Sequence, residues 1–183
     1  MVYDDCLEGK LVNLRSVEER DAEFTYQIRQ NKEKTKFLHA VTGTIEDQRQ
    51  WIHSQRERKG DYFFIAEDKN GNPIGTDGVL NIENNTGEVG RLLSLGTPLQ
   101  SSETALLTFG FAFDICMLEY VRIYMTQENI PSLGFNLRMG AKEVNRVYDS
   151  ELGHTIINLT VQKEDFYKSR EKINKLIDRF GAR

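Results

Sequence analysis

The stretch that follows Pro98 constrains the fold most, because it predicts one long helix that is buried almost all round. Ser101 or Ser102 can cap this helix, and the pattern extends it to about Met117. Its apolar residues spread widely around the helix instead of lining a single stripe, which is typical of a largely buried helix. The rest of the chain must therefore supply the sheet and helices that cover it.

The segments on either side follow one another in the order β-αα-β-β-β-α-β-α-β-β-α. Residues 10–15 alternate apolar and polar side chains, as a half-buried strand does. Capping boxes at Ser16/Glu19 and Thr44/Asp47 open two helices. Further strands are expected at 62–66, 74–82, 88–95, 120–125, 143–149 and 154–161, and further helices at 129–139 and 163–183. Hairpins followed by crossovers predict an α+β (mixed α/β) fold, with residues 1–183 as a single domain.

Charge and composition exclude several classes of function. The net charge of −4 gives no basic field for nucleic acid or an anionic membrane. No apolar run approaches the ~18 residues of a membrane span, and the first ten residues carry charge throughout. Cys6 and Cys116 are too far apart in sequence to form a disulfide framework or a metal cluster. We therefore expect a cytoplasmic protein with no metal, no nucleic-acid partner and no membrane partner.

Three segments resemble the GNAT N-acetyltransferases. The stretch from Asn129 to Ala141 is similar to the family's motif of an asparagine, a small residue, an apolar residue, a basic residue and glycine. The segments 111–114 and 121–123 look like the family's long helix and fifth strand. Glu88-Val-Gly90 is similar to the opening of the fourth strand in the RimJ/RimL-like branch. The resemblance implies a mostly antiparallel GNAT sheet with an extra C-terminal helix, and acetyl-CoA as co-substrate.

The family's glycine-rich pyrophosphate loop has no counterpart here. Glycine at the start of the long helix lets phosphates approach the free N–H groups, but residues 98–105 contain none. One alignment puts Glu103 against the pyrophosphate. The other, which we favour, shortens the loop and turns Glu103 along the helix into structure or solvent. The resemblance then implies the following cofactor-binding residues: Leu93, Ser94, Leu95, Gln100, Ser101, Ser102, Thr104, Asn129, Ser132 and Arg138.

The resemblance also implies catalytic roles. Glu88 is the first candidate for the base that takes the amine proton, directly or through water. The alternative is a solvated residue, or a partner of Arg91. The family's acid, a tyrosine, is replaced by Asn136, which cannot protonate a thiolate but can hydrogen-bond its sulfur. Water, Tyr124 or Tyr148 are the alternatives for that proton. His39 and Glu88 are expected to face the acceptor.

The acceptor itself is left open by the sequence. A small-molecule amine, such as an amino sugar or a nucleotide-linked amino sugar, is one hypothesis; Arg29 and neighbouring basic residues then meet a diphosphate or are ordinary surface charges. A protein N-terminus, as in RimJ/RimL relatives, is the second. A catalytically weak CoA-binding module is the third. A homodimer is expected through the late strands or through the last helix, whose stripe from Phe166 to Phe180 covers either its own core or a partner.

Overall fold

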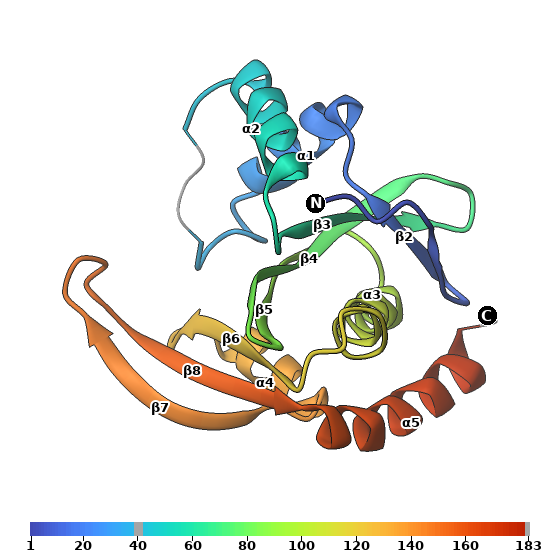
Figure 1. Cartoon of the computed structure of the whole chain (residues 1–183), viewed down its shortest axis with the longest axis vertical. Coiled ribbons are helices and arrows are strands. Elements are labelled where there is room, and N and C mark those ends of the chain that lie inside the picture. Colours follow the sequence, from blue (N-terminus) through green and yellow to red (C-terminus); the bar gives the residue numbers. More distant parts are fainter. Residues whose placement is uncertain (39–41, 182–183) are drawn as a thin grey trace.

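The computed structural model describes residues 1–38 and 42–181, which form one eight-stranded sheet in the order β1-β2-β3-β4-β5-β6-β8-β7 (Figure 1). Each neighbouring pair is antiparallel except β5 and β6, which are parallel. The sheet is therefore mixed and mostly antiparallel, as expected. The strands are β1 (Leu7–Glu8), β2 (Val12–Ser16), β3 (Tyr62–Asp68), β4 (Pro73–Glu83), β5 (Thr86–Ser94), β6 (Tyr120–Thr126), β7 (Lys142–Asp149) and β8 (His154–Gln162).

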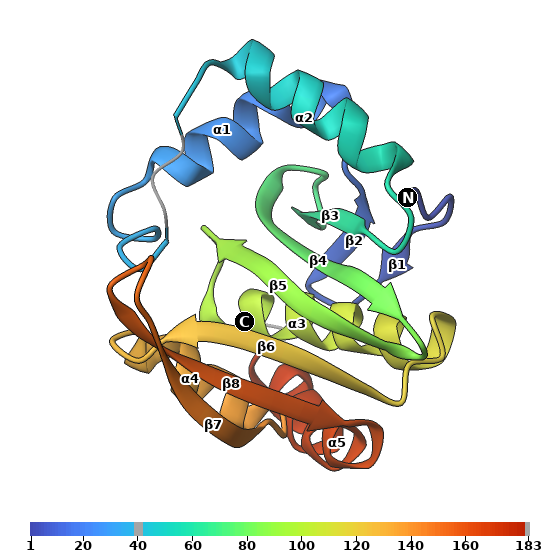
Figure 2. The same ribbon diagram turned by 60° about the vertical axis from the view of Figure 1, so that its left-hand side comes forward.

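The helices cover the two faces of this sheet unequally. One face carries α1 and α2, and the other carries α3, α4 and α5 (Figure 2). The helices are η1 (Glu19–Asp21), α1 (Ala22–Gln30), α2 (Ile45–Glu57), α3 (Pro98–Gly110), the π-helical η2 (Phe111–Ile115), α4 (Ile130–Arg138) and α5 (Lys163–Phe180). Within residues 1–38 and 42–181, none of them has the length and apolar character needed to cross a membrane.

The larger core lies between the sheet and α3 with α5. Phe109, Phe113 and Phe166 pack there with ring centroids 5.4–6.4 Å apart, so α3 is buried as predicted. Helix α5 covers its own core, while Leu176 and Phe180 at the edge of its stripe stay 49% and 42% exposed. A smaller cluster, which includes Ile52 and Phe63, lies under α1 and α2.

Two helices begin elsewhere than the sequence predicts. Helix α3 starts three residues before Ser101, because Pro98 has the φ of a first helical residue and Thr97 forms a capping box with Gln100. In the same way, Ser16 stays in β2 and bonds Tyr3, and the first capping box is Glu18 with Asp21. The Thr44/Asp47 box is confirmed.

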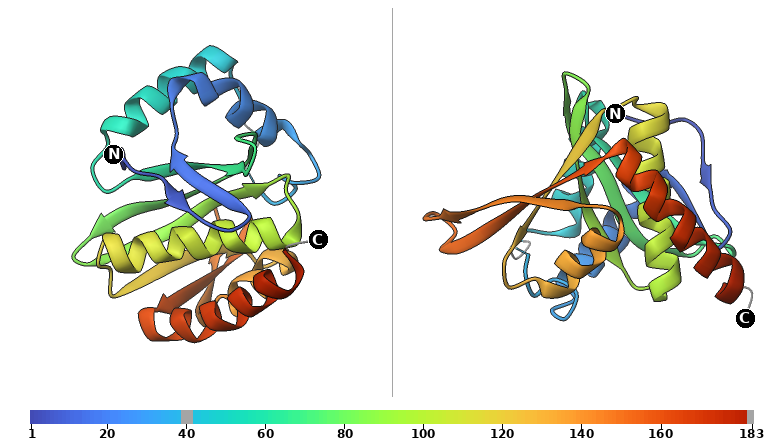
Figure 3. Two further views of the ribbon diagram at one scale, coloured as in Figure 1. Left: turned by 90° about the vertical axis from the view of Figure 1, so that its right-hand side faces the viewer. Right: turned by 90° about the horizontal axis from the view of Figure 1, so that it is seen from below.

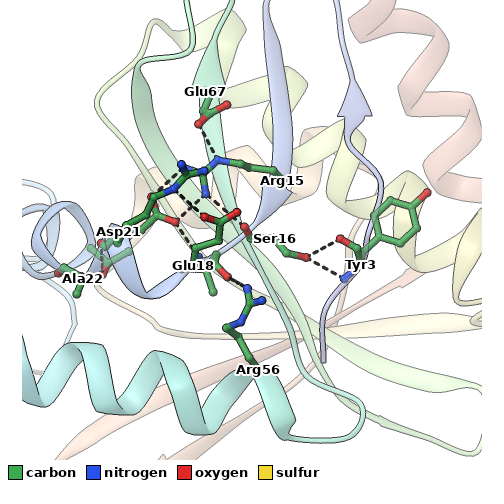
Figure 4. A network of polar contacts seen from close by, with 11 residues as sticks. Tyr3, Arg15, Ser16, Glu18, Asp21, Ala22, Arg56 and Glu67 are labelled. Carbon is green, nitrogen blue, oxygen red and sulfur yellow. Dashed lines mark hydrogen bonds and ion pairs between the residues drawn. The ribbon is translucent and has the colours of Figure 1, made fainter.

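An ion-pair network fixes the start of α1 on the sheet (Figure 4). The Arg15 guanidinium contacts both oxygens of Asp21 at 2.7 and 2.8 Å, and its Nε donates to Glu67 at 2.7 Å. From α2, Arg56 donates to the carbonyl of Val17. Both helices on this face are thereby tied to β2 and β3, while the β7–β8 hairpin projects from the far end of the sheet (Figure 3).

Candidate active site

Strands β5 and β6 separate in the middle of the sheet. Their parallel pairing runs only from Thr86↔Tyr120 to Glu88↔Arg122, although β5 continues to Ser94 and β6 to Thr126. The two strands therefore splay apart (Figure 2), and in the described part of the chain no strand pairs with the edge of β5 beyond Glu88. Backbone groups on such an edge can hydrogen-bond an extended molecule inserted between the strands.

A β-bulge lies on this free edge. Between the pairs Gly78↔Gly90 and Thr76↔Leu93, one residue of β4 opposes two residues of β5. Arg91 takes a φ of 69° in the bulge, and the Thr76 hydroxyl donates to its carbonyl at 2.8 Å. Bulges re-aim backbone groups and side chains, so here the bulge sets the direction of the backbone that leads to Leu93.

Hydroxyl groups surround the first turns of α3, close to the end of β5. The Ser101 hydroxyl donates to that of Ser94 at 2.8 Å, and the Ser102 hydroxyl donates to the Pro98 carbonyl at 2.8 Å. Thr104 is buried and bonds the Gln100 carbonyl at 2.9 Å. Leu95 is 50% exposed. The predicted cofactor-binding residues of β5 and α3 are thus neighbours, and the helix N-terminus adds a positive dipole end.

Glu103 does not face this helix start. Its carboxylate is buried and accepts hydrogen bonds from the backbone N–H groups of Lys10, Leu11 and Val12, at 2.8, 2.6 and 2.8 Å. Of the two alignments, the one that turns Glu103 into the structure is therefore the one the fold adopts. No carboxylate of α3 opposes an anion at the first turn.

Glu88 lies at the last paired position before the splay. It is directly opposite Arg122, whose guanidinium is 3.9 Å from its carboxylate. The alternative that Glu88 pairs with Arg91 is wrong, because Arg91 binds Asp61 across β4. Among the described residues, the Arg122 Nε and the Thr126 hydroxyl are buried without a hydrogen-bond partner. Buried polar atoms of this kind mark a place that a ligand or water completes.

Helix α4 begins just after β6. Asn129 caps it by accepting from the Ser132 N–H at 3.2 Å. Asn136 is buried, and its amide nitrogen donates to the carbonyl and hydroxyl of Ser132 at 2.9 and 3.3 Å. Its donors are therefore engaged inside the helix. Arg138 is exposed in the last turn, at the opposite end of α4 from Asn129.

A cavity of about 500 Å³ lies between α1, α2 and the sheet. Its wall is mainly apolar and includes Trp51 and Phe63 together with four threonines. The lining residues are Thr25, Ile28, Arg29, Thr42, Thr44, Asp47, Gln48, Trp51, Phe63, Thr76, Arg91 and Leu93. Leu93 therefore belongs to both the cavity and the splayed edge. Thr76 and Gln48 carry no sequence signal, and His39 lies outside the described residues.

The splayed strand pair, the bulge and the cavity meet at Leu93, and the family to which the chain belongs identifies their chemistry. Residues 12–142 match the family described as "Acetyltransferase (GNAT) domain". The chain belongs to this family and is an acyltransferase. A search of curated proteins gave no match.

Solved structures share the fold at low sequence identity. FdhC, described as a nucleotide-linked sugar GNAT, is 24% identical with a TM-score of 0.79, over 93% of this chain and 97% of its own. A GCN5-related N-acetyltransferase from Brucella melitensis is 15% identical with a TM-score of 0.80, over 94% and 85%. Spermidine N-acetyltransferase from Vibrio cholerae, solved with CoA and spermine, is 13% identical with a TM-score of 0.78, over 87% and 99%.

Proposed function

We propose that the chain acetylates the primary amine of a small molecule with acetyl-CoA, and that the acceptor is an amino sugar, free or nucleotide-linked. The observation that carries the proposal is the position of Leu93, which lies on the part of β5 beyond its pairing with β6 and also lines the cavity. A thioester held along the edge would meet an amine held in the cavity at this residue. Such alignment is a large part of catalysis in acyl transfer.

The residues present suit acetyl-CoA. The unpaired edge of β5 offers backbone partners to an amide-containing arm, and the hydroxyls of Ser101 and Ser102 stand at the dipole end of α3. When bound, the cofactor supplies an activated acetyl group. Asn129 caps the N-terminus of α4, whereas Arg138 lies at the other end of the helix. A cofactor contact is therefore less well supported for Arg138 than for Asn129.

The chain's own groups then serve the transfer. An N–H near Leu93 would stabilise the oxyanion that forms when the amine attacks the thioester carbonyl. Glu88, half-buried on β5, would take the amine proton directly or through water. Because the amide donors of Asn136 are engaged with Ser132, we assign the thiolate proton to water or to Tyr124, which is 48% exposed on β6.

The lining of the cavity suits a sugar ring better than a polyamine. The Trp51 and Phe63 rings match the apolar side of a sugar ring, and the Thr42 hydroxyl can bond a sugar hydroxyl. The Thr25, Thr44 and Thr76 hydroxyls and the Gln48 amide nitrogen already hydrogen-bond other protein groups. A polyamine would need several carboxylates, but Asp47 is the one acidic side chain in the described lining and already accepts from the Thr44 N–H and hydroxyl.

Calorimetry of acetyl-CoA binding tests the proposal. Ser102→Asp puts a carboxylate in the second turn of α3, close to the proposed phosphate site, where it should weaken binding severely. Ser150→Asp adds the same charge on the exposed β7–β8 turn and should leave binding unchanged. Absence of wild-type binding at millimolar acetyl-CoA would refute the acetyltransferase function. Equal binding by the wild type and both variants would refute the cofactor site.

An acceptor panel then separates the remaining hypotheses. We expect turnover with amino sugars or nucleotide-linked amino sugars, and little with spermidine. Turnover with peptide N-termini instead would identify the RimJ/RimL-type activity. Cofactor binding with no turnover of any amine would identify a CoA-binding module. The reaction is proposed for the cytoplasm, consistent with the acidic composition of the chain.

We also propose a homodimer through β7. This edge strand is exposed along nearly its whole length, and its apolar side chains Val144, Val147 and Tyr148 are 59%, 51% and 66% exposed. Exposed apolar edges invite pairing with another strand. Light scattering should give a dimer mass for the wild type and a monomer mass for Val147→Lys. A monomeric wild type would refute this interface.

A further inference from the structure

A fully buried carboxyl group lies beneath the bulge of β5. Asp77 is the single β4 residue that opposes the two bulged residues, and its side chain is 0% exposed. It is the cross-strand partner of Phe64, which belongs to the core on the α3 side, whereas its neighbour Thr76 lines the cavity on the other side. The Asp77 carboxyl is therefore on the back of the site.

This carboxyl group is incompletely bonded. Its Oδ1 accepts from the Gly78 N–H at 2.9 Å, but in the part of the chain that the structure describes Oδ2 has no hydrogen-bond partner. An unbonded carboxylate oxygen in a core is costly, so each such atom calls for an explanation. A carboxyl with a bound proton is far less costly to bury.

Among the residues that the structure describes, no cationic group stands close enough to neutralise a negative charge on Asp77. From β5, the Arg91 side chain leaves through the opposite face to bind Asp61. From α3, the buried Thr108 hydroxyl lies nearby and donates to the Thr104 carbonyl at 3.1 Å, while the Glu103 carboxylate is occupied by backbone N–H groups. Burial raises the pKa of Asp77 to about 8, although the nearby Thr108 hydroxyl and the Gly78 N–H act in the opposite direction.

We propose that Asp77 is a positioning residue for acyl transfer: its uncharged side chain supports the bulge, and a charge there displaces the backbone that leads to Leu93. The inference rests on the proposed function, because it concerns the same β5 edge. The Thr76 hydroxyl holds the bulge from the cavity side, and Asp77 supports it from the core side. Ionisation would place an unpaired charge in a core that cannot solvate it.

Trp51 provides a readout of the bulge that is independent of activity. The Arg91 guanidinium is part of the bulge residue and lies 5.3 Å from the Trp51 ring centroid. Trp51 is the chain's sole tryptophan, so a displacement of the bulge would change its emission. The Met1 amino group also touches this region through the Asp61 carbonyl, and burial lowers its pKa from 8.0; its titration would persist in an Asp77 variant.

If Asp77 served only to stabilise the fold, its effect would appear in a different pH range. Because the pKa of Asp77 is raised in the folded state, its contribution to stability is complete below about pH 4, declines as pH rises towards 8 and is constant above that. Ionised Asp77 displaces the bulge only as the pH rises past about 8, where the decline in stability ends. Stability and site geometry therefore respond to Asp77 in separate pH windows.

The test compares wild type, Asp77→Asn and Thr108→Val between pH 6.5 and 9.5, with acetyl-CoA calorimetry and Trp51 emission as readouts. We expect the wild-type affinity to fall about tenfold or more above pH 8, since small misplacements in a site are costly, with a matching change in emission. Asp77→Asn should show neither change. Thr108→Val should move both midpoints to higher pH, because the lost hydroxyl lowers the pKa of Asp77.

Parallel pH profiles for the wild type and Asp77→Asn would overturn the inference, as would a midpoint that Thr108→Val leaves in place. Failure of the wild type to bind acetyl-CoA at pH 7 would instead refute the proposed function. In that case the emission profiles still decide whether Asp77 controls the bulge. The asparagine side chain has nearly the same shape as the protonated acid, which preserves the packing.

Discussion

The Arg91 guanidinium binds both carboxylate oxygens of Asp61, at 2.5 and 3.0 Å, and at the same time lies 5.3 Å from the ring centroids of Trp51 and Phe63. This contact joins the bulge of β5 to the segment that enters β3, across the intervening strand β4. It also fixes a cationic group in the cavity wall. Planar, bidentate and stacked geometry of this kind suits arginine and not lysine.

Arg91→Gln should destabilise the protein by about 3 kcal/mol, the lower end of the range for breaking a buried ion pair. The lower end applies because Gln55 and Arg58 still contact Asp61. Urea unfolding followed by circular dichroism measures the change. Arg91→Lys, which keeps the charge and loses the bidentate geometry, should lie between the variant and the wild type; a loss under ~0.5 kcal/mol for Arg91→Gln would contradict the role of the pair.

Asp61→Asn should make the protein less sensitive to acid. Burial by itself would raise the pKa of Asp61, but hydrogen bonds and charge from Arg91 outweigh it and leave the pKa below the usual 3.8. A lowered folded-state pKa gives stability that is present above the unfolded value and lost as pH falls through the folded value. Thermal unfolding between pH 2 and 7 should therefore show a shallower acid slope for the variant; parallel curves would contradict the assignment.

Glu103→Gln should cost about 2–3 kcal/mol of stability with little effect on turnover. The carboxylate accepts from three backbone N–H groups, and an amide with one acceptor oxygen leaves some of these buried donors unpaired. Glu119→Gln, at an exposed position before β6, is the matched control. A large loss of acetyl-CoA affinity with unchanged stability would show that Glu103 faces the cofactor after all.

Glu88→Gln should lower kcat by about 10²–10⁴ if Glu88 is the base. The KM for acetyl-CoA should change little, because the substitution preserves the shape of β5. Glu83→Gln, at the exposed end of β4, removes the same charge outside the site and should have no effect. Steady-state kinetics with the best acceptor from the panel makes the comparison, and equal kcat for all three proteins would remove Glu88 from the mechanism.

Much of this fold follows from local signals. The Thr44/Asp47 box, the hairpin strands and the buried central helix could be predicted because capping, alternation and apolar spread act over a few residues. The start of α3 could not, because Ser101 and Ser102 look as suitable as Thr97 until the capping partner Gln100 is considered. The pairing of Arg91 with Asp61 could not be predicted from the sequence either, because the two residues meet only across a third strand.

The candidate site divides in the same way. Glu88, Ser101 and Ser102 were predicted by resemblance and stay predictions, and the RimJ/RimL-like branch, also suggested by resemblance, is not confirmed. Thr76, Gln48 and Asp77 carry no recognisable motif, because their importance comes from the bulge and from the packing of α2. The orientation of Glu103 illustrates the general difficulty: two alignments were open, and distant N–H groups at the start of β2 decide between them.

The brief pairing of β5 with β6 has a mechanical consequence. The sheet consists of two parts, one formed by β1 to β5 and the other by β6, β8 and β7. Three residue pairs between β5 and β6 join the two parts along the backbone. An extended ligand between β5 and β6 would complete the sheet, so it would keep the two strands apart and also connect them. The co-substrate would then be part of the enzyme's sheet as well as a reactant. Each release of product would weaken the connection between the two parts of the sheet.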